Sequence, residues 1–135
     1  MTDLEIAKNR LEGHTICLCK DGNCIYSDGR GISPMMNFIA DGVGLAGYSV
    51  ADIVVGKAAA LLFVRCGIKE VFAKILSNPA RKVLEENGVP YTYQTLTEKI
   101  INRTGTDVCP MEKAVAETDN PDQAYELLKH KLATM

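Results

Sequence analysis

Residues 69–96 read KEVFAKILSNPARKVLEENGVPYTYQTL, and this stretch decides the fold class. Its first eight and last eight residues are typical of strands, because apolar, β-branched and aromatic side chains recur there in short runs. Between them, Asn78-Pro79 and Asn87-Gly88 carry the start and stop signals of a helix. The stretch therefore predicts a strand–helix–strand unit, in which a helix joins two parallel strands.

The segment before residue 28 predicts a helix followed by a hairpin. Leu4, Ala7 and Leu11 stand at helical spacing among charged residues, which predicts an amphipathic helix over residues 3–11 that ends at Gly13. The next residues, HTICLCKDGNCIYSDG, alternate as strands do around Asp21-Gly22, a dipeptide favoured in two-residue hairpin turns. We expect strands at about 14–20 and 23–27.

Residues 30–67 predict two further helices. Ser33 before Pro34 indicates the start of a short helix. The residues from Ser49 to Asp52 fit a capping box, in which a hydroxyl and a carboxylate three residues on bind the first free N–H groups of a helix. We expect a long, buried helix from about residue 50 to residue 65, ended by Gly67.

The remaining residues predict short helical pieces around a loop. Residues 97–103, TEKIINR, are expected to begin as a turn of helix, and residues 104–107 to form a loop. A helix is expected from Cys109 to about Ala116, and a last one from Pro121 to about Leu132. The chain is therefore predicted to be an α/β layered domain with a mixed sheet of at least four strands.

Composition and charge exclude some classes of function. The 135 residues suit one domain, and the formal net charge is −2. The fifteen basic residues do not cluster, so binding to nucleic acid is unsupported. Residues 53–64 form the longest apolar stretch, which is far shorter than the ~20 residues that span a bilayer. With no signal peptide pattern at the N-terminus, we expect no membrane association and a cytoplasmic protein.

The five cysteines are predicted to be reduced. If Asp21-Gly22 is the hairpin loop, Cys19 faces Cys24 in a non-hydrogen-bonded pair, close enough for a disulfide or a shared soft metal. We favour small, buried, reduced thiols, because no histidine or fourth cysteine stands at ligand spacing. No metal and no cofactor is predicted.

The segment 102–113, NRTGTDVCPMEK, concentrates polar side chains in one connection. Pro110 suits the first position of a helix, which places Cys109 at the N-cap and Glu112 at the third helical position. A thiolate at a helix start is stabilised by the helix dipole, so Cys109 is a candidate nucleophile. The alternative is a cap-and-turn segment with a buried thiol.

Lys57 is the one cation in an otherwise apolar run. Either its ammonium group contacts a ligand, or its stem packs while the ammonium reaches water. Asp52, five residues earlier, is interpreted first as a cap carboxylate and otherwise as a helper in proton transfer.

The order of elements resembles the cytidine deaminase-like fold, a three-layer architecture with helices on both faces of the sheet. In the zinc enzymes of that fold, two helix starts carry three metal ligands and a general-base glutamate. The corresponding segments here are residues 49–57 and 109–112. The first, VADIVVGK, has no histidine, cysteine or glutamate, and the second offers one thiol where two are needed. The resemblance thus implies the fold without the zinc, which makes deamination improbable.

Nearly the whole chain is identified as a member of an uncharacterised prokaryotic family, the domain of unknown function 1893. The matching stretches are KDGNCIYSDGRGISPMM, ADIVVGKAAALL, ILSNPARKVLEENGV and IINRTGTDVCPMEKAV. Membership implies one domain over residues 1–135 and leaves the reaction open. The candidate catalytic residues in these stretches are Cys109, Lys57 and Asp52, and the candidate ligand-binding residues are Arg30, Gly31, Ser33, Ser77, Asn102, Arg103, Thr104 and Glu112.

Four hypotheses about function follow. The first is a zinc-free protein that binds a nucleoside, nucleotide or other phosphate-bearing small molecule between the two helix starts. The second is an enzyme that uses Cys109 as a nucleophilic or redox thiol. A residual metalloenzyme ranks third, since three good ligands are not visible. The fourth is a non-catalytic structural or interaction subunit, and the resemblance also implies a homo-oligomer.

Overall fold

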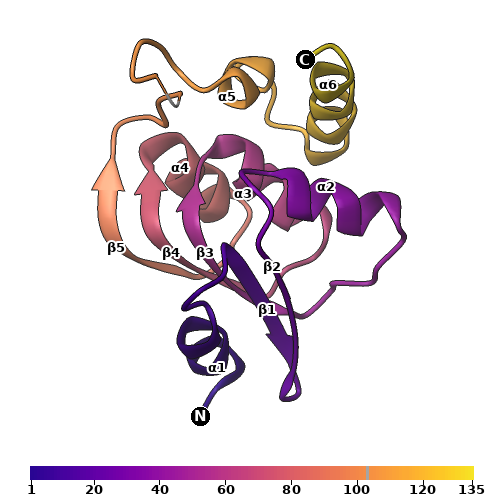
Figure 1. Cartoon of the computed structure of the whole chain (residues 1–135), viewed down its shortest axis with the longest axis vertical. Coiled ribbons are helices and arrows are strands. Elements are labelled where there is room, and N and C mark those ends of the chain that lie inside the picture. Colours follow the sequence, from indigo (N-terminus) through magenta and orange to yellow (C-terminus); the bar gives the residue numbers. More distant parts are fainter. Residues whose placement is uncertain (103) are drawn as a thin grey trace.

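A five-stranded mixed sheet forms the centre of the molecule (Figure 1). The computed structural model describes residues 1–102 and 104–135. The strand order is β2-β1-β3-β4-β5, in which β3, β4 and β5 are parallel and β1 is antiparallel to both neighbours. The strands are β1 (Ile16–Lys20), β2 (Asn23–Ser27), β3 (Ser49–Val55), β4 (Glu70–Ser77) and β5 (Tyr91–Thr97).

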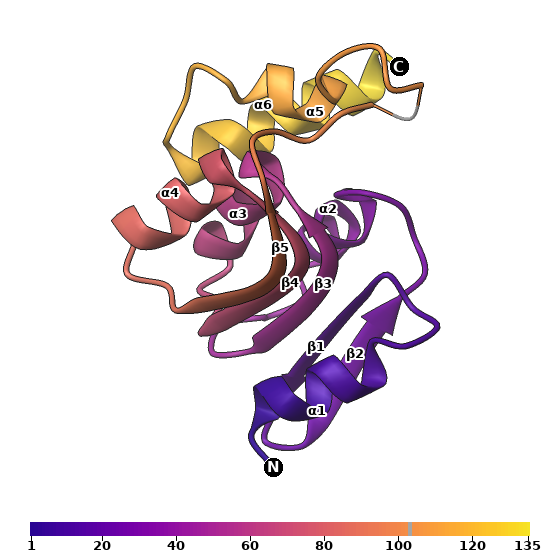
Figure 2. The same cartoon turned by 90° about the vertical axis from the view of Figure 1, so that its left-hand side faces the viewer.

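Helices cover both faces of the sheet, as predicted. On one face α1 (Asp3–Arg10) packs alone on the strands and forms a small apolar cluster with them. The opposite face carries α2 (Ser33–Ala40), α3 (Lys57–Arg65) and α4 (Asn78–Glu86) over the main core. The last two helices, α5 (Pro110–Ala114) and α6 (Pro121–Ala133), lie beyond the carboxyl ends of the parallel strands (Figures 1 and 2).

The helices of the described residues are too short and too polar to cross a membrane. Ala124 and Leu128 bury one side of α6, and α6 packs on α3. This contact holds the carboxyl-terminal helix above the sheet.

The strand–helix–strand prediction for residues 69–96 is confirmed. It corresponds to β4, α4 and β5, with the strands parallel. The cap of α4 is Ser77, whose hydroxyl accepts a hydrogen bond from the backbone N–H of Ala80 at 3.1 Å. The predicted ligand residue Ser77 is therefore a buried helix cap.

The hairpin prediction is also confirmed. Asp21 and Gly22 both have positive φ, 51° and 80°, as the two-residue turn requires. Cys19 pairs with Cys24 in the expected register. These cysteines form a disulfide, with their Cα atoms 4.1 Å apart, so the prediction that both are reduced is wrong. Cross-strand partners in a non-hydrogen-bonded pair already lie at bridging distance, and burial alone does not keep them apart.

The predicted helix start at Ser49 is wrong. Residues 49–55 form β3, and the helix begins only at Lys57, with Gly56 as a cap that has no side-chain hydrogen bond. The Ser49 hydroxyl instead donates to Glu70 Oε2 at 2.8 Å. A central parallel strand is buried on both faces, so its continuous apolar run has the same periodicity as a buried helix.

The turn of helix expected at residues 97–103 is also wrong. Thr97 ends β5, and residues 98–102 and 104–109 form an irregular connection with an isolated bridge between Ile101 and Val108, while Arg103 lies outside the described residues. The backbone N–H of Asn102 donates to Asp107 O at 2.8 Å, which closes the loop on itself. The connection returns the chain to the carboxyl ends of the strands, where α5 begins.

Candidate functional site

Glu112 joins the two helix starts that the sequence singled out. Its Oε1 accepts a hydrogen bond from the backbone N–H of Lys57 at 2.7 Å, and its Oε2 accepts one from Ala58 at 2.8 Å. A Cβ atom at Gly56 would lie 2.3 Å from Glu112 Oε1, so only glycine admits the carboxylate here. The first N–H groups of α3 are thus satisfied by a side chain of α5.

The carboxyl group of Glu112 is largely buried. Burial raises its pKa, while the hydrogen bonds from Ala58 and Lys57 and the charge of Lys57 lower it. The helix dipole of α3 favours the ionised form at this position. The predicted ligand residue Glu112 therefore has two protein partners in place.

Cys109 is the N-cap residue of α5, with Pro110 in the first turn, as predicted. Its thiol makes no capping hydrogen bond, and the Glu112 side chain binds α3 instead of returning to Cys109. The backbone of Cys109 is well held: its N–H donates to Ile100 O at 2.9 Å. The thiol is half-buried and free. Cys109 and Glu112 thus hold the predicted positions in α5, but neither side chain caps the start of this helix.

The Lys57 side chain binds the connection between α5 and α6. Its Nζ donates to Ala116 O at 3.2 Å and lies 3.3 Å from Asp119 Oδ1. Its side chain is 15% exposed, and it lines a separate cavity of about 540 Å³ beside α4. Lys57, the first residue of α3, therefore links that helix to the connection between α5 and α6. It does not line the cavities that contain Cys109.

Asp52 lies in the middle of the sheet, paired with Ile16 on β1 and Ala73 on β4. Burial raises its pKa to about 8, although hydrogen bonds from the backbone of Ile53 and Val54 lower it. At neutral pH its carboxyl group is mainly protonated. The cap role predicted for Asp52 is wrong, because the residue is in a strand. Nor does any hydrogen bond among residues 1–102 and 104–135 connect it with Cys109.

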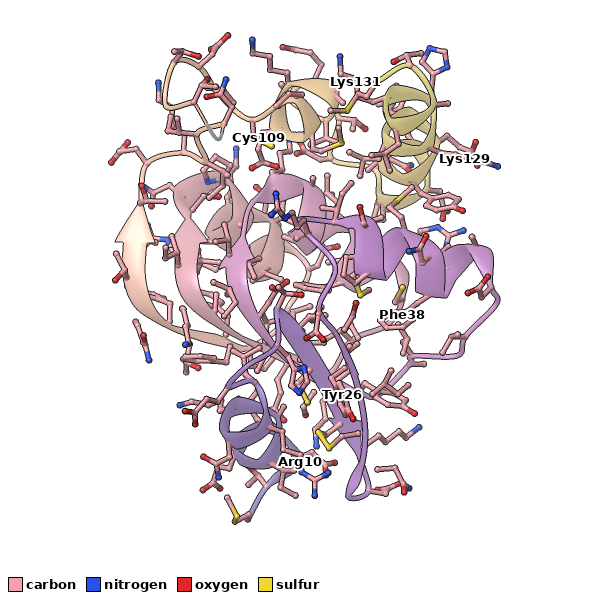
Figure 3. All side chains as sticks on the ribbon, viewed as in Figure 1. Arg10, Tyr26, Phe38, Cys109, Lys129 and Lys131 are labelled. Carbon is pink, nitrogen blue, oxygen red and sulfur yellow. A yellow bond between two sulfur atoms is a disulfide. The ribbon has the colours of Figure 1, made fainter. Side chains whose placement is uncertain are left out.

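A cavity of about 760 Å³ opens beside Cys109. We call it the Arg30–Cys109 pocket. Its lining comes from the segment before α2, the connection after β5, the start of α5 and the end of α6. These residues are Arg30, Gly31, Ile32, Ser33, Ile101, Asn102, Thr104, Cys109, Pro110, Met111, Leu132 and Met135. Figure 3 labels Cys109 at the start of α5, beyond the carboxyl ends of the parallel strands.

Six of the predicted site residues line this pocket together. They are Arg30, Gly31, Ser33, Asn102, Thr104 and Cys109. A smaller cavity of about 90 Å³ adjoins it and adds Glu112 and Gly56. Lys57, Asp52 and Ser77 lie elsewhere, and Arg103 falls outside the described residues.

The polar lining is of two kinds. Asn102 organises its own loop: its Oδ1 accepts hydrogen bonds from Thr104 Oγ1 and from the backbone of Thr106, both at 3.1 Å. In contrast, the side chains of Arg30 and Ser33 have no hydrogen-bond partner within the described part of the chain. These two residues are therefore the ones available to a ligand.

Sequence reasoning missed the apolar wall of the pocket. Ile32, Ile101, Met111, Leu132 and Met135 supply it, and each comes from the end of an element or from a loop. Isolated apolar residues at such places are indistinguishable from core residues by periodicity. Ile32, Ile101 and Met111 stand next to polar candidates in the sequence, whereas Leu132 and Met135 carry no such signal.

Comparison with known proteins gives a family, and solved structures include a similar protein. The family model of a domain of unknown function, DUF1893, matches residues 6–132. The crystal structure of a DUF1893 family protein from Thermotoga maritima, at 2.70 Å resolution, superposes with a TM-score of 0.83 and 26% sequence identity. The alignment covers 100% of this chain and 92% of that chain. No curated protein matches significantly.

Proposed function

We propose that this chain, which belongs to the DUF1893 family, binds a nucleoside, nucleotide or other phosphate-bearing small molecule in the Arg30–Cys109 pocket. The observation that carries the proposal is the pocket itself, which joins free polar groups and an apolar wall from four separate segments. Its volume of about 760 Å³ suits such a ligand, since small-molecule sites are mostly apolar clefts with a few convergent polar groups. Its place beyond the carboxyl ends of parallel strands is where α/β sheets usually bind ligands.

We also propose a specific type for the fold. We take residues 1–135 as a single domain of the cytidine deaminase-like type, in which the starts of α3 and α5 adjoin through Glu112. At this junction the donors are one thiol, of Cys109, and one carboxylate that already accepts two backbone N–H groups. This donor set does not fit a catalytic zinc, which needs three protein ligands, so the proposed function is zinc-free.

The contacts of the helix starts limit where a phosphate binds. The first N–H groups of α3 are taken by Glu112, and at the start of α5 the Cys109 N–H is taken by Ile100 while Pro110 has none. Among the described residues that line the pocket, the positive group is the exposed guanidinium of Arg30, and the Ser33 hydroxyl lines the same pocket. We therefore place an anionic group at Arg30 and the ring of the ligand against Ile32, Met111 and Leu132.

Calorimetric titration with a panel of nucleosides, nucleoside mono- and triphosphates and inorganic phosphate tests the proposal. We expect at least one phosphorylated nucleoside to bind with a stoichiometry of one. R30A should weaken the binding of that ligand by roughly tenfold or more, because a charge-assisted hydrogen bond is worth about 1.5–3 kcal/mol. R30A should weaken the binding of the parent nucleoside, which lacks the phosphate, by a smaller factor.

The matched control is K129A, which removes an exposed cation of α6 that does not line the pocket. K129A should bind the ligand as the wild type does. The proposal fails if no member of the panel binds, or if R30A and the wild type bind every member equally.

An interaction subunit that self-associates is the second candidate, and exposed apolar side chains on the sheet favour it. Ile75 on β4 is 36% exposed and Tyr93 on β5 is 40% exposed. Val54, the register partner of Ile75 on β3, is 39% exposed but also lines the small cavity beside Cys109. Surfaces of this kind mark contacts with other proteins when they are contiguous. Sedimentation velocity of the wild type and of I75S decides it: a dimer that I75S dissociates supports this function, and a monomeric wild type excludes self-association.

A further inference from the structure

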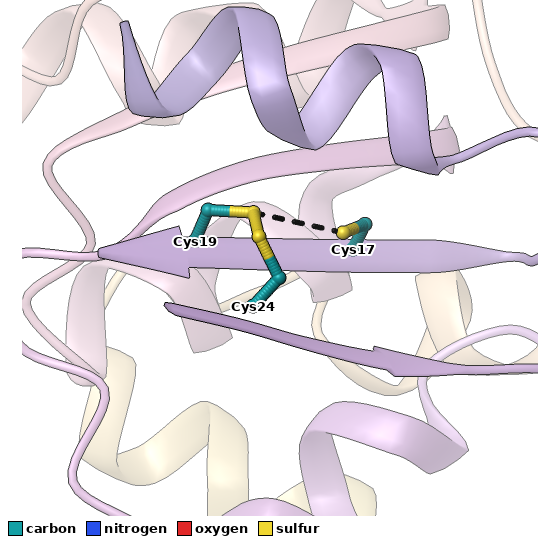
Figure 4. Close-up of side chains that lie close together, drawn as sticks. All are labelled: Cys17, Cys19 and Cys24. Carbon is teal, nitrogen blue, oxygen red and sulfur yellow. Dashed lines mark hydrogen bonds between the residues drawn. A yellow bond between two sulfur atoms is a disulfide. The ribbon is translucent and has the colours of Figure 1, made fainter. Parts of the chain in front are cut away.

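Three cysteine sulfurs lie together on the face of the sheet that α1 covers, far from the Arg30–Cys109 pocket. Cys17, Cys19 and Cys24, which we call the three-cysteine cluster, place their sulfurs within 4.8 Å of one another. Figure 4 shows Cys17 and Cys19 on β1 and Cys24 on β2, with all three sulfurs on the side facing α1. This is the one group of potential metal ligands found among the described residues.

The strands position these sulfurs without help from a loop. Cys17 and Cys19 are two residues apart on β1, so their side chains share a face, and Cys24 is the cross-strand partner of Cys19. Ala7 of α1 and Leu11, the residue that follows the helix, pack over the same cluster. The result is a rigid, largely apolar setting for three soft ligands, and ligands on rigid elements are the most precisely placed.

We propose that the three-cysteine cluster, once the Cys19–Cys24 disulfide is reduced, binds one Cu(I) ion through three thiolates. Two sulfurs each about 2.3 Å from one ion lie about 3.8–4.0 Å apart. Cys17 Sγ and Cys19 Sγ are 3.8 Å apart. The Cys17–Cys19 sulfur distance therefore already suits a shared ion. Once the Cys19–Cys24 bond is reduced, these two sulfurs can move apart to the same separation.

The choice of Cu(I) follows from the number and kind of the ligands. Thiolates select soft ions such as Cu(I) and Zn²⁺, and zinc takes four protein ligands in structural sites or three with a water in catalytic ones. Cys17 and Cys19 are fully buried in the apolar cluster under α1, a poor place for the water that a three-ligand zinc needs. No fourth histidine, cysteine or carboxylate belongs to this cluster in the part of the chain that is described. Three thiolates alone therefore favour the monovalent ion.

The chemistry balances in two steps. A dithiol reductant gives two electrons and two protons to the Cys19–Cys24 disulfide and itself becomes a disulfide. The three thiols then exchange three protons for one Cu(I), which leaves a net charge of −2 at the site. Burial raises the pKa of the Cys17 thiol, and the positive charge of Arg10 at the end of α1 partly offsets that rise. Cys24, half-buried on the edge strand β2, gives the ion its route of entry.

The disulfide makes binding dependent on the redox state. With Cys19 and Cys24 bonded to each other, only the Cys17 thiol is free, and one buried thiol is no site. The oxidised protein should therefore bind no Cu(I) here, and a thiol reductant should create the site.

The test is a titration of the full chain, reduced with a phosphine and kept anaerobic, with Cu(I) in competition with a chromophoric chelator. We expect one equivalent bound, and X-ray absorption should show three sulfur ligands. C17A and C24A should each weaken binding by at least about tenfold, because even a change in the groups that hydrogen-bond to metal ligands costs roughly 10–100-fold in affinity. C66A is the matched control, because Cys66 is a free, half-buried cysteine outside the cluster.

Circular dichroism establishes that each variant is folded. If C17A unfolds because Cys17 is fully buried, C24A on the edge strand decides. The assignment is overturned if C24A binds Cu(I) as tightly as C66A, if the disulfide form binds it equally well, or if the reduced protein takes up Zn²⁺ in preference to Cu(I).

Discussion

Glu112 Oε1 accepts a hydrogen bond from the backbone N–H of Lys57, 2.7 Å away across 55 positions of sequence. A glutamate in the first turn of α5 thus caps α3. Its carboxylate accepts hydrogen bonds from the N–H groups of both Lys57 and Ala58. The contact fixes the two helix starts against each other. It also occupies a helix terminus that would otherwise attract an anionic ligand.

Removal of the Glu112 carboxylate should destabilise the fold. E112A leaves the N–H groups of Lys57 and Ala58 without their acceptor, which should lower the free energy of unfolding by about 1–3 kcal/mol. E112Q keeps one carbonyl oxygen and should lose less. Urea denaturation measures both, with E117A, an exposed glutamate of the same segment, as the control. An E112A midpoint equal to that of E117A would refute the capping role.

G56A should destabilise through the same contact. The φ of Gly56 is −99°, which alanine adopts freely, so the effect is steric. The new Cβ would meet Glu112 Oε1 at 2.3 Å and Ile100 Cγ1 at 2.9 Å. We expect a loss of about 1–3 kcal/mol, as overpacking typically costs.

A double mutant separates the two neighbours of Gly56. In G56A/E112A the carboxylate clash is gone, so the two losses should be less than additive by about 0.5 kcal/mol or more. G44A is the control, because no atom lies within 4 Å of its added Cβ. Full additivity of the two losses would show that Ile100, and not Glu112, opposes the methyl group.

Asp52 should make stability fall as pH rises. Its pKa is about 8 in the folded protein against an ordinary value of 3.8. Between these two pH values the folded protein holds a proton that the unfolded chain has released, so each pH unit removes up to about 1.4 kcal/mol of stability. The loss begins above pH 4 and is complete above pH 8.

D52N removes this titration. The stability of the variant should depend less steeply on pH than that of the wild type. Its free energy of unfolding should rise relative to the wild type as pH increases from 5 to 8. Urea denaturation at several pH values measures the difference. Glu112, whose pKa is also raised, contributes a slope of the same sign in both proteins. Parallel pH profiles for D52N and the wild type would mean that folding does not raise the pKa of Asp52.

Local signals in the sequence were sufficient for the parts of the fold that local interactions determine. Asp21-Gly22 predicted the hairpin and its register, and Asn78-Pro79 with Gly88 bracketed α4. Gly67, with φ of 73°, follows α3 as expected. These positions depend on backbone geometry, which the residue type reveals by itself.

The errors fall where tertiary structure decides. The run from Val50 to Val55 has no period that separates a central strand from a buried helix, so β3 was missed and Asp52 was placed on a helix. Pairing of Cys19 with Cys24 was foreseen, but not the bond. Glu112 was assigned to its own helix by the capping-box spacing, and its actual partner lies 55 positions away. Six predicted site residues nevertheless line one pocket, because polar side chains collect in connections at the carboxyl ends of strands.

Substitution of Lys57 should affect stability and spare ligand binding. K57M keeps most of the stem but loses the contacts of Nζ with Ala116 O and Asp119. Because Asp119 is 71% exposed, solvent screens that ion pair, and we expect a loss of about 1 kcal/mol. Affinity for the pocket ligand should not change, since Lys57 lines a different cavity. K129M is the control for stability, and a K57M protein of normal stability with weakened ligand binding would restore Lys57 to the site.

The reactivity of the Cys109 thiol distinguishes a pocket that only binds a ligand from a catalytic one. No hydrogen bond to this thiol is made by the residues that the structure describes, and Lys57 and Asp52 are engaged elsewhere. We therefore expect iodoacetamide to alkylate Cys109 at pH 6 no faster than a thiol in an unfolded peptide. A pocket ligand should slow the reaction further by covering the cysteine, and peptide mapping should show Cys66 unaffected. Faster alkylation of Cys109 than of the peptide would favour the nucleophilic enzyme instead, because only an activated thiol reacts ahead of its free counterpart at that pH.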